Sequence, residues 1–146
     1  MSEGQRRPRP SYYRYNKSPV KVMFPDDYEN PGIWRLSIDT GGWKSVDSLV
    51  LIELQSDVGG EVDRIDRKRF IDLTESERAY YLRGDGPIFA LYGTIAALED
   101  QAISEGRPLT QNERAMIHGL RRKTYAMFER ELHQRGDPGA DPDPES

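Results

Sequence analysis

The stretch PIFALYGTIAALEDQAISE, residues 87–105, predicts the helix around which the rest of the chain is arranged. Pro87 suits the first position of a helix, where no N–H is needed, and Gly106 can end the helix in a left-handed cap. Apolar side chains recur at helical spacing along it: Ile88, Leu91, Tyr92, Ile95, Leu98, Ala102 and Ile103. The opposite face carries small side chains, so we expect other elements to cover this helix on more than one side.

Glu99 is the exception on the apolar face of this helix. At about 100° per residue, it falls between Ile95 and Ile103. A buried carboxylate is costly unless it is paired, so Glu99 either meets a cation or a hydroxyl group, or the helix is rotated so that Glu99 is exposed. Buried, paired carboxylates also occur in active sites. We interpret the role of Glu99 as structural, because a structural pair is the more common case.

A repeated heptapeptide predicts the starts of two further helices. Residues 73–79 and 109–115 both read Leu-Thr-x-x-Glu-Arg-Ala. Each copy contains a capping box, in which the threonine oxygen accepts a backbone N–H and the glutamate reaches back. The boxes are Thr74 with Glu77 and Thr110 with Glu113. We expect one helix from 74 to about 83 and one from 110 to about 135, the latter folded back on the helix at 87–105.

The N-terminal half of the chain has the patterns of a sheet. Residues 20–24 and 33–39 alternate between apolar and polar side chains, which is typical of half-buried strands. Residues 48–55 form the most apolar run, which favours a central strand, whereas 61–70 fits no period and is expected at a solvated edge. The predicted fold is α+β: a small antiparallel sheet of three to four strands packed against three helices, the last two forming an antiparallel hairpin.

Charge is distributed unevenly along the chain, whose net charge is -4. Residues 1–21 hold six Lys and Arg against one Glu, and 136–146 hold four Asp and Glu with no basic residue. Neither end has apolar periodicity, which is typical of segments that do not fold. We therefore expect a flexible basic arm at 1–18, a single α+β domain at 19–135 and a disordered, acidic, proline-rich tail at 136–146.

Composition excludes several kinds of chemistry. The chain has no cysteine, so disulfides, thiolate metal sites and cysteine nucleophiles are excluded. It has two histidines, His118 and His133, and a zinc site with three imidazoles cannot be built from them. No apolar run is long enough to span a membrane, and the N-terminus has no signal-peptide pattern. We expect a cytoplasmic protein with no cofactor, no metal and no membrane partner.

One short motif has a resemblance to an enzyme family. Leu36-Ser-Ile-Asp-Thr-Gly resembles the active-site signature of aspartic proteases, in which two such aspartates share a proton. This chain has a single copy, at Asp39, and its second half is helical, whereas those proteases are nearly all β. We interpret the motif as an ordinary turn.

Two stretches are candidates for binding a partner. The last helix has a basic and aromatic face, formed by Arg114, His118, Arg121, Arg122 and Tyr125, which suits an acidic partner or phosphates. In the arm, aromatic and basic residues alternate: Tyr12, Tyr13, Arg14, Tyr15 and Lys17. Tyrosine rings can stack on bases while Arg and Lys contact phosphates, so the arm suits single-stranded nucleic acid or an acidic protein groove.

The sequence therefore favours a non-catalytic protein-binding or assembly protein, of the accessory kind that is common among regulatory and bacteriophage-type proteins. It would act through the surface of the last helix and its two unlike tails. The expected partner is another protein, with a homo-oligomer left open. The alternative is a nucleic-acid-binding protein that uses the arm and the basic face of the last helix.

Overall fold

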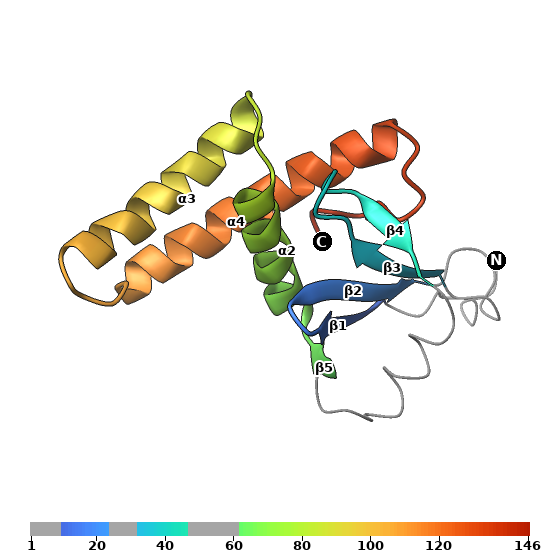
Figure 1. Cartoon of the computed structure of the whole chain (residues 1–146), viewed down its shortest axis with the longest axis horizontal. Helices are drawn as coiled ribbons and strands as arrows, with labels where there is room; N and C mark the ends of the chain where they lie inside the picture. Colours follow the sequence, from blue (N-terminus) through green and yellow to red (C-terminus); the bar gives the residue numbers. More distant parts are fainter. Residues whose placement is uncertain (1–9, 24–31, 47–61) are drawn as a thin grey trace.

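The structure, a computed structural model, describes residues 10–23, 32–46 and 62–146 (Figure 1). In these ranges the chain forms one antiparallel sheet and three helices, which confirms the predicted α+β class. The strands are β1 (Ser11–Tyr15), β2 (Ser18–Met23), β3 (Gly32–Leu36), β4 (Trp43–Ser45) and β5 (Val62–Ile65). The helices are α2 (Arg67–Tyr81), α3 (Pro87–Ser104) and α4 (Gln111–Gln134). The described strands number five rather than three to four, in the order β4-β3-β2-β1-β5.

Strand β1 occupies part of the predicted flexible arm, which corrects the boundary placed at residue 18. It lies between β2 and β5, with Tyr12 opposite both Lys21 and Ile65. Asn16 turns the chain into β2 with a φ of 56°, a left-handed conformation that asparagine tolerates better than most residues. Tyrosine favours strands, and the tyrosines of β1 serve both faces of the sheet, but the segment lacks the aliphatic residues that usually reveal a strand. The rest of the predicted arm, 1–9, and the apolar run 48–55 lie outside the described residues.

The sheet has apolar side chains on both faces. On the face toward the helices, β1, β3 and β4 contribute Tyr12, Trp34, Leu36 and Trp43 to the main core, while Lys21 of β2 points to the same side. The other face carries a second cluster of Val20, Val22 and Ile33, with Tyr13, Tyr15, Val46 and Val62 packed against it. The period of two explains why neighbouring residues of β1 and β2 belong to different clusters.

Helix α2 begins seven residues before the predicted start, so the capping box at Thr74 is wrong. Asp66 caps the helix, because its side chain accepts from the N–H of Arg69 at 2.8 Å. Thr74 is consequently buried inside the helix. The second box is confirmed: Glu113 N–H donates to the Thr110 hydroxyl at 3.1 Å, and Thr110 N–H donates to Glu113 at 2.8 Å. No helix among the described residues is long and apolar enough to cross a membrane.

Helix α3 has the predicted bounds but a different place in the fold. Gly106 follows it with a φ of 64°, as expected for a left-handed cap. Helices α3 and α4 form the predicted antiparallel hairpin, which extends away from the sheet (Figure 1). The small side chains of Ala90, Thr94 and Ala97 are exposed, so no described element covers this second face of α3. The helix that contacts both α2 and α3 is α4.

The C-terminal segment packs on the domain, which corrects the expectation of a disordered tail from residue 136. Gly139, Ala140 and Asp141 are buried. The Asp137 carboxylate accepts from the backbone N–H of Trp43 at 3.1 Å, and the Asp141 carboxylate accepts from the Tyr125 hydroxyl at 2.9 Å. Apolar periodicity cannot reveal such a segment, because acidic side chains hold it in place by satisfying buried donors.

Ending the chain after residue 136 should therefore destabilise the domain. An unpaired buried hydroxyl costs about 1–3 kcal/mol. The truncation removes the acceptor of the Tyr125 hydroxyl and the carboxylate that pairs with Arg67, which keeps, of its described hydrogen bonds, only the one to Tyr12. We expect the melting temperature to fall by several degrees in thermal unfolding followed by circular dichroism. A chain ending after Asp141 keeps these bonds and serves as the control, with nearly full-length stability. Equal melting of all three proteins would contradict the observed packing of this segment.

Candidate functional site

Four charged side chains are buried where α2, α4 and the sheet meet. They are Lys21, Glu75, Arg78 and Glu129, each at most 1% exposed. We call them the central ionic cluster. The positive charges of its two cations equal the negative charges of its two carboxylates. Buried groups need such pairing if they are to remain ionised. Buried carboxylates can mark an active site, so their surroundings decide what this cluster can do.

Arg78 forms hydrogen bonds to both carboxylates of the cluster. Its Nη2 donates to Glu129 Oε2 at 2.5 Å, and its Nη1 donates to Glu75 Oε2 at 2.8 Å. Nε and Nη2 also donate to the carbonyl oxygen of Gly41, at 3.0 and 2.8 Å. The guanidinium thus joins two helices to the turn between β3 and β4. Its central carbon also lies 4.1 Å from the centre of the Phe128 ring, close enough for a cation–π contact.

The turn that meets Arg78 requires glycine. Gly41 has a φ of 79°, which residues with a Cβ rarely adopt. A Cβ at this position would also lie 2.4 Å from the ring of Phe128 and 2.7 Å from Leu82. Asp39, in the same turn, has a side chain that is 81% exposed, and Thr40 Oγ1 accepts from Gly42 N–H. The motif that resembles aspartic proteases is therefore a packed turn with an exposed aspartate.

The two carboxylates of the cluster are perturbed in opposite directions. Burial raises the pKa of Glu75, and the nearby Arg78 only partly offsets this. Burial acts on Glu129 in the same sense, but Arg78 and Lys21 outweigh it and hold the pKa of Glu129 below its ordinary value. Glu75 also accepts from the Tyr92 hydroxyl at 2.9 Å. Opposed pKa shifts can serve acid–base catalysis, but here every carboxylate oxygen already accepts a hydrogen bond from the protein.

The cluster is closed to solvent and acts as a structural centre. Glu129 accepts from the indole N–H of Trp43 and from the backbone N–H of Asp141, both at 2.9 Å. A groove of about 480 Å³ between α2 and α3 borders on Glu75, whose side chain is nevertheless 0% exposed. In the described part of the chain, no three Asp, Glu or His side chains are grouped so that they could hold a metal.

Lys21 is the member of the cluster whose hydrogen-bonding group lacks a close partner. Its Nζ lies 3.6 Å from Glu129 Oε1 and 4.0 Å from the centre of the Trp43 ring. Among the described residues it has no acceptor within hydrogen-bond distance. Burial lowers the pKa of Lys21 to about 8, although Glu129 opposes the shift.

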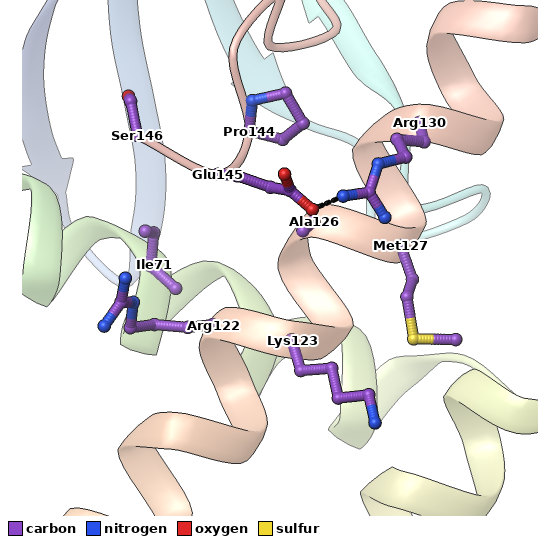
Figure 2. Close-up of a pocket in the computed structure, with 9 residues that line it drawn as sticks. All are labelled: Ile71, Arg122, Lys123, Ala126, Met127, Arg130, Pro144, Glu145 and Ser146. Atoms are coloured by element: carbon purple, nitrogen blue, oxygen red, sulfur yellow. Dashed lines mark ion pairs between the residues drawn. The ribbon is translucent and has the colours of Figure 1, made fainter.

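A second site, open to solvent, lies along α4 (Figure 2). It is a groove of about 320 Å³ between α4, the first turns of α2 and the C-terminal segment. Its lining residues are Ile71, Arg122, Lys123, Ala126, Met127, Arg130, Pro144, Glu145 and Ser146. We call it the basic groove, because three of these side chains are cationic and one is acidic. The apolar members Ile71 and Ala126 are buried and form its floor.

The cations of the basic groove differ in their pairing. Arg130 forms an ion pair with Glu145 of the C-terminal segment, drawn as a dashed line in Figure 2. Arg122 and Lys123 come from the preceding turns of the helix, and neither forms an ion pair with another described residue. The groove therefore presents unneutralised positive charge beside an apolar floor.

The basic face predicted on the last helix is not a single surface. Arg114 is exposed and donates to the carbonyl oxygen of Leu109, far from the groove. His118 Nδ1 lies 2.9 Å from Asp72 of α2, and Arg121 lies 3.9 Å from Glu99 of α3. Tyr125 is 0% exposed and belongs to the core. His118 and Arg121 face α2 and α3, where carboxylates meet them, whereas Arg114 and Arg122 are exposed.

Of the predicted residues on this helix, Arg122 alone lines the groove, and sequence reasoning missed Lys123 and Arg130. The sequence does contain a pattern that could have predicted this surface: Arg122, Ala126 and Arg130 are spaced by four and share one side of a helix. Glu99 is not buried: its side chain is 44% exposed, although it lies 3.9 Å from a cation, Arg121. The buried carboxylates among the described residues are Glu75, Glu129 and Asp141. Glu99 lies at the edge of the face that packs on α4, next to the exposed Ile103, so its carboxylate reaches solvent.

The arm residues are also engaged within the domain. Tyr12 packs on Phe70, with ring centroids 4.5 Å apart, and its hydroxyl accepts from Arg67 at 2.8 Å. Arg14 forms an ion pair with Asp63 across the β1–β5 ladder. Tyr13 and Tyr15 pack against the second apolar cluster of the sheet. The predicted arm contacts Tyr12, Tyr13, Arg14 and Tyr15 are thus parts of a strand.

The position of Lys21 predicts an unusual dependence of stability on pH. Its pKa of about 8 lies below its ordinary value of 10.5, so between these values the unfolded chain binds more protons than the folded protein. The free energy of unfolding should therefore rise with pH in this window, by at most about 1.4 kcal/mol per unit. Below pH 10 the buried tyrosines, whose pKa values are raised by burial, do not oppose this.

Urea denaturation at intervals between pH 7.5 and 9.5 tests this with Lys21→Met as the comparison. Methionine has a similar length and no charge, so its curve should lack the rise that the wild type shows. If the free energy of unfolding changes with pH in the same way in both proteins, burial does not lower the pKa of Lys21.

Comparison with known proteins gives no relative from which a role could be transferred. No protein-family model, no curated protein and no solved structure matches the chain. Inference about function therefore depends on the geometry and charge of the two sites described above.

Proposed function

We propose that this is a non-catalytic binding protein that captures an acidic segment of another protein in the basic groove. The observation that carries the proposal is the ion pair between Arg130 and Glu145, because the chain itself places a carboxylate in this groove. Arg122 and Lys123 line the same groove without an ion pair among the described residues. They are available to a second carboxylate.

The chemistry of the groove suits an acidic segment that contains small apolar residues. Arginine binds carboxylates through directed, charge-assisted hydrogen bonds. Exposed ion pairs are individually weak, about 0.2–1 kcal/mol, so useful affinity requires several of them together with apolar contact. Ile71, Ala126 and Met127 supply that contact beneath the cations.

The sequence of the bound segment indicates what pattern fits. Residues 141–145 read Asp-Pro-Asp-Pro-Glu, and Pro144 and Glu145 are the residues that line the groove. Proline restricts the unbound chain, which lowers the entropy lost on binding. We therefore expect the partner segment to alternate proline or another small residue with Asp or Glu.

Nucleic acid is less well supported as the partner. The aromatic and basic stretch that would stack on bases forms β1, where Tyr12 is buried and Arg14 is paired with Asp63. No described aromatic residue lines the basic groove, and stacking on aromatic rings is what single strands require. The same cations can bind phosphate, so an oligonucleotide is a necessary comparison in the test.

Reversing the free charges of the groove should abolish capture of an acidic peptide. In Arg122→Glu combined with Lys123→Glu, two attractive contacts become repulsive, which should weaken binding at least about tenfold. The measurement is fluorescence anisotropy of a labelled peptide of alternating Pro and Glu, at low salt. Circular dichroism should show an unchanged fold, because both side chains are exposed.

The matched control is Arg114→Glu combined with Lys44→Glu, which changes the net charge equally at exposed positions outside the groove. It should bind the peptide nearly as tightly as the wild type, apart from a small loss of long-range attraction. Equal affinity of the groove variant and the control would overturn the proposal. Tighter binding of a single-stranded oligonucleotide than of the peptide would favour nucleic acid as the partner.

A further inference from the structure

We propose that residues 143–146 act as a built-in competitor that occupies Arg130 of the basic groove until an acidic partner displaces them. This inference rests on the proposed function and adds its regulation. It follows from a division of the C-terminal segment into an anchored part and a weakly held part, which meet at Asp141.

The anchored part ends at Asp141, whose contacts are buried. Its carboxylate accepts from the Tyr125 hydroxyl and pairs with Arg67 at 3.0 Å. Its backbone N–H donates to Glu129 of the central ionic cluster. Displacing this residue would leave buried groups without partners, so the segment is fixed here.

Beyond Asp141 the contacts lie at the surface. Pro142, Asp143, Glu145 and Ser146 are exposed, and only Pro144 is half-buried. The pair between Glu145 and Arg130 joins side chains that are 68% and 48% exposed. Arg67 holds the rest by donating to the carbonyl oxygens of Asp143 and Ser146, at 3.2 and 2.9 Å. Contacts of this kind are readily exchanged for water.

The weakly held part occupies the place that an acidic partner would take. Pro144, Glu145 and Ser146 form one wall of the groove, and Glu145 neutralises Arg130 (Figure 2). An incoming segment must therefore compete with Glu145 for Arg130. Because residues 143–146 are tethered at Asp141, their local concentration is high even though each contact is weak.

Competition of this kind reduces the apparent affinity in proportion to the fraction of molecules in which Arg130 is free of Glu145. One exposed ion pair with two peripheral hydrogen bonds is expected to keep Arg130 occupied in most molecules. Removing residues 143–146 should then strengthen binding of the Pro–Glu peptide about three- to tenfold. Glu145→Lys should have the same effect, because it replaces attraction to Arg130 by repulsion.

The matched control for Glu145→Lys is Glu105→Lys, the same charge change at the far end of the α3–α4 hairpin. It should leave peptide affinity almost unchanged. Unchanged affinity in the truncated chain, while charge reversal of Arg122 and Lys123 still abolishes binding, would overturn the competitor and leave the proposed function standing. Loss of binding in the truncated chain would also overturn it, because residues 143–146 would then form part of the site.

The mobility of a spin label on residue 146 reports on residues 143–146 directly, and this measurement separates the two proposals. The chain has no cysteine, so Ser146→Cys carries a spin label at a single position. Its spectrum should show restricted motion, and Glu145→Lys in the same chain should release it. Addition of the peptide should release it as well. A freely moving label before any change would overturn the competitor, whatever the outcome of the binding test.

Discussion

The ion pair between Arg78 and Glu129 is the interaction on which the rest of the structure depends. It joins α2 to α4 across 51 residues of sequence, and both side chains are 0% exposed. Removing two charges from water is costly, so such a pair persists only where other hydrogen bonds satisfy the remaining donors and acceptors. Here Gly41, Glu75, Trp43 and Asp141 supply them. Each of these partners comes from a different part of the fold.

This arrangement connects the buried centre to the proposed binding site. Glu129 accepts from the backbone of Asp141, and Asp141 in turn accepts from Tyr125 and pairs with Arg67. The C-terminal segment is therefore attached to the same centre that fixes α4. The basic groove lies between these two elements, so its width depends on how firmly the segment is held beyond Asp141.

Local signals in the sequence predicted those parts of the fold that local chemistry determines. Pro87 and Gly106 bound α3 correctly, and Thr110 with Glu113 begins the last helix as a capping box. The same heptapeptide failed at Thr74, because Asp66 offers an earlier cap and the chain remains helical through it. Capping motifs mark where a helix can begin, and upstream residues decide whether it has already begun.

The central ionic cluster could not be predicted in this way. Hydrophobic periodicity assigns polar residues to the surface, and Glu75, Arg78 and Glu129 are polar. Their burial depends on partners that are distant in sequence, and the same is true of Asp141 in a segment that looks disordered. Of the candidate binding residues on the last helix, Arg122 is exposed and lines the basic groove, and its exposure follows from its place on the helix. Tyr125 was misplaced, because α2 covers its side of the helix.

A double-mutant cycle on Arg78 and Glu129 tests most directly whether this pair organises the fold. The proteins are the wild type, Arg78→Met, Glu129→Gln and the double variant, compared by urea denaturation. Breaking one partner of a buried pair costs about 3–5 kcal/mol, because the other partner is left uncompensated. We expect large single losses and a double loss smaller than their sum by more than about 1.5 kcal/mol. Losses that add to within about 0.5 kcal/mol would show that the two residues do not interact and that the pair does not organise the fold.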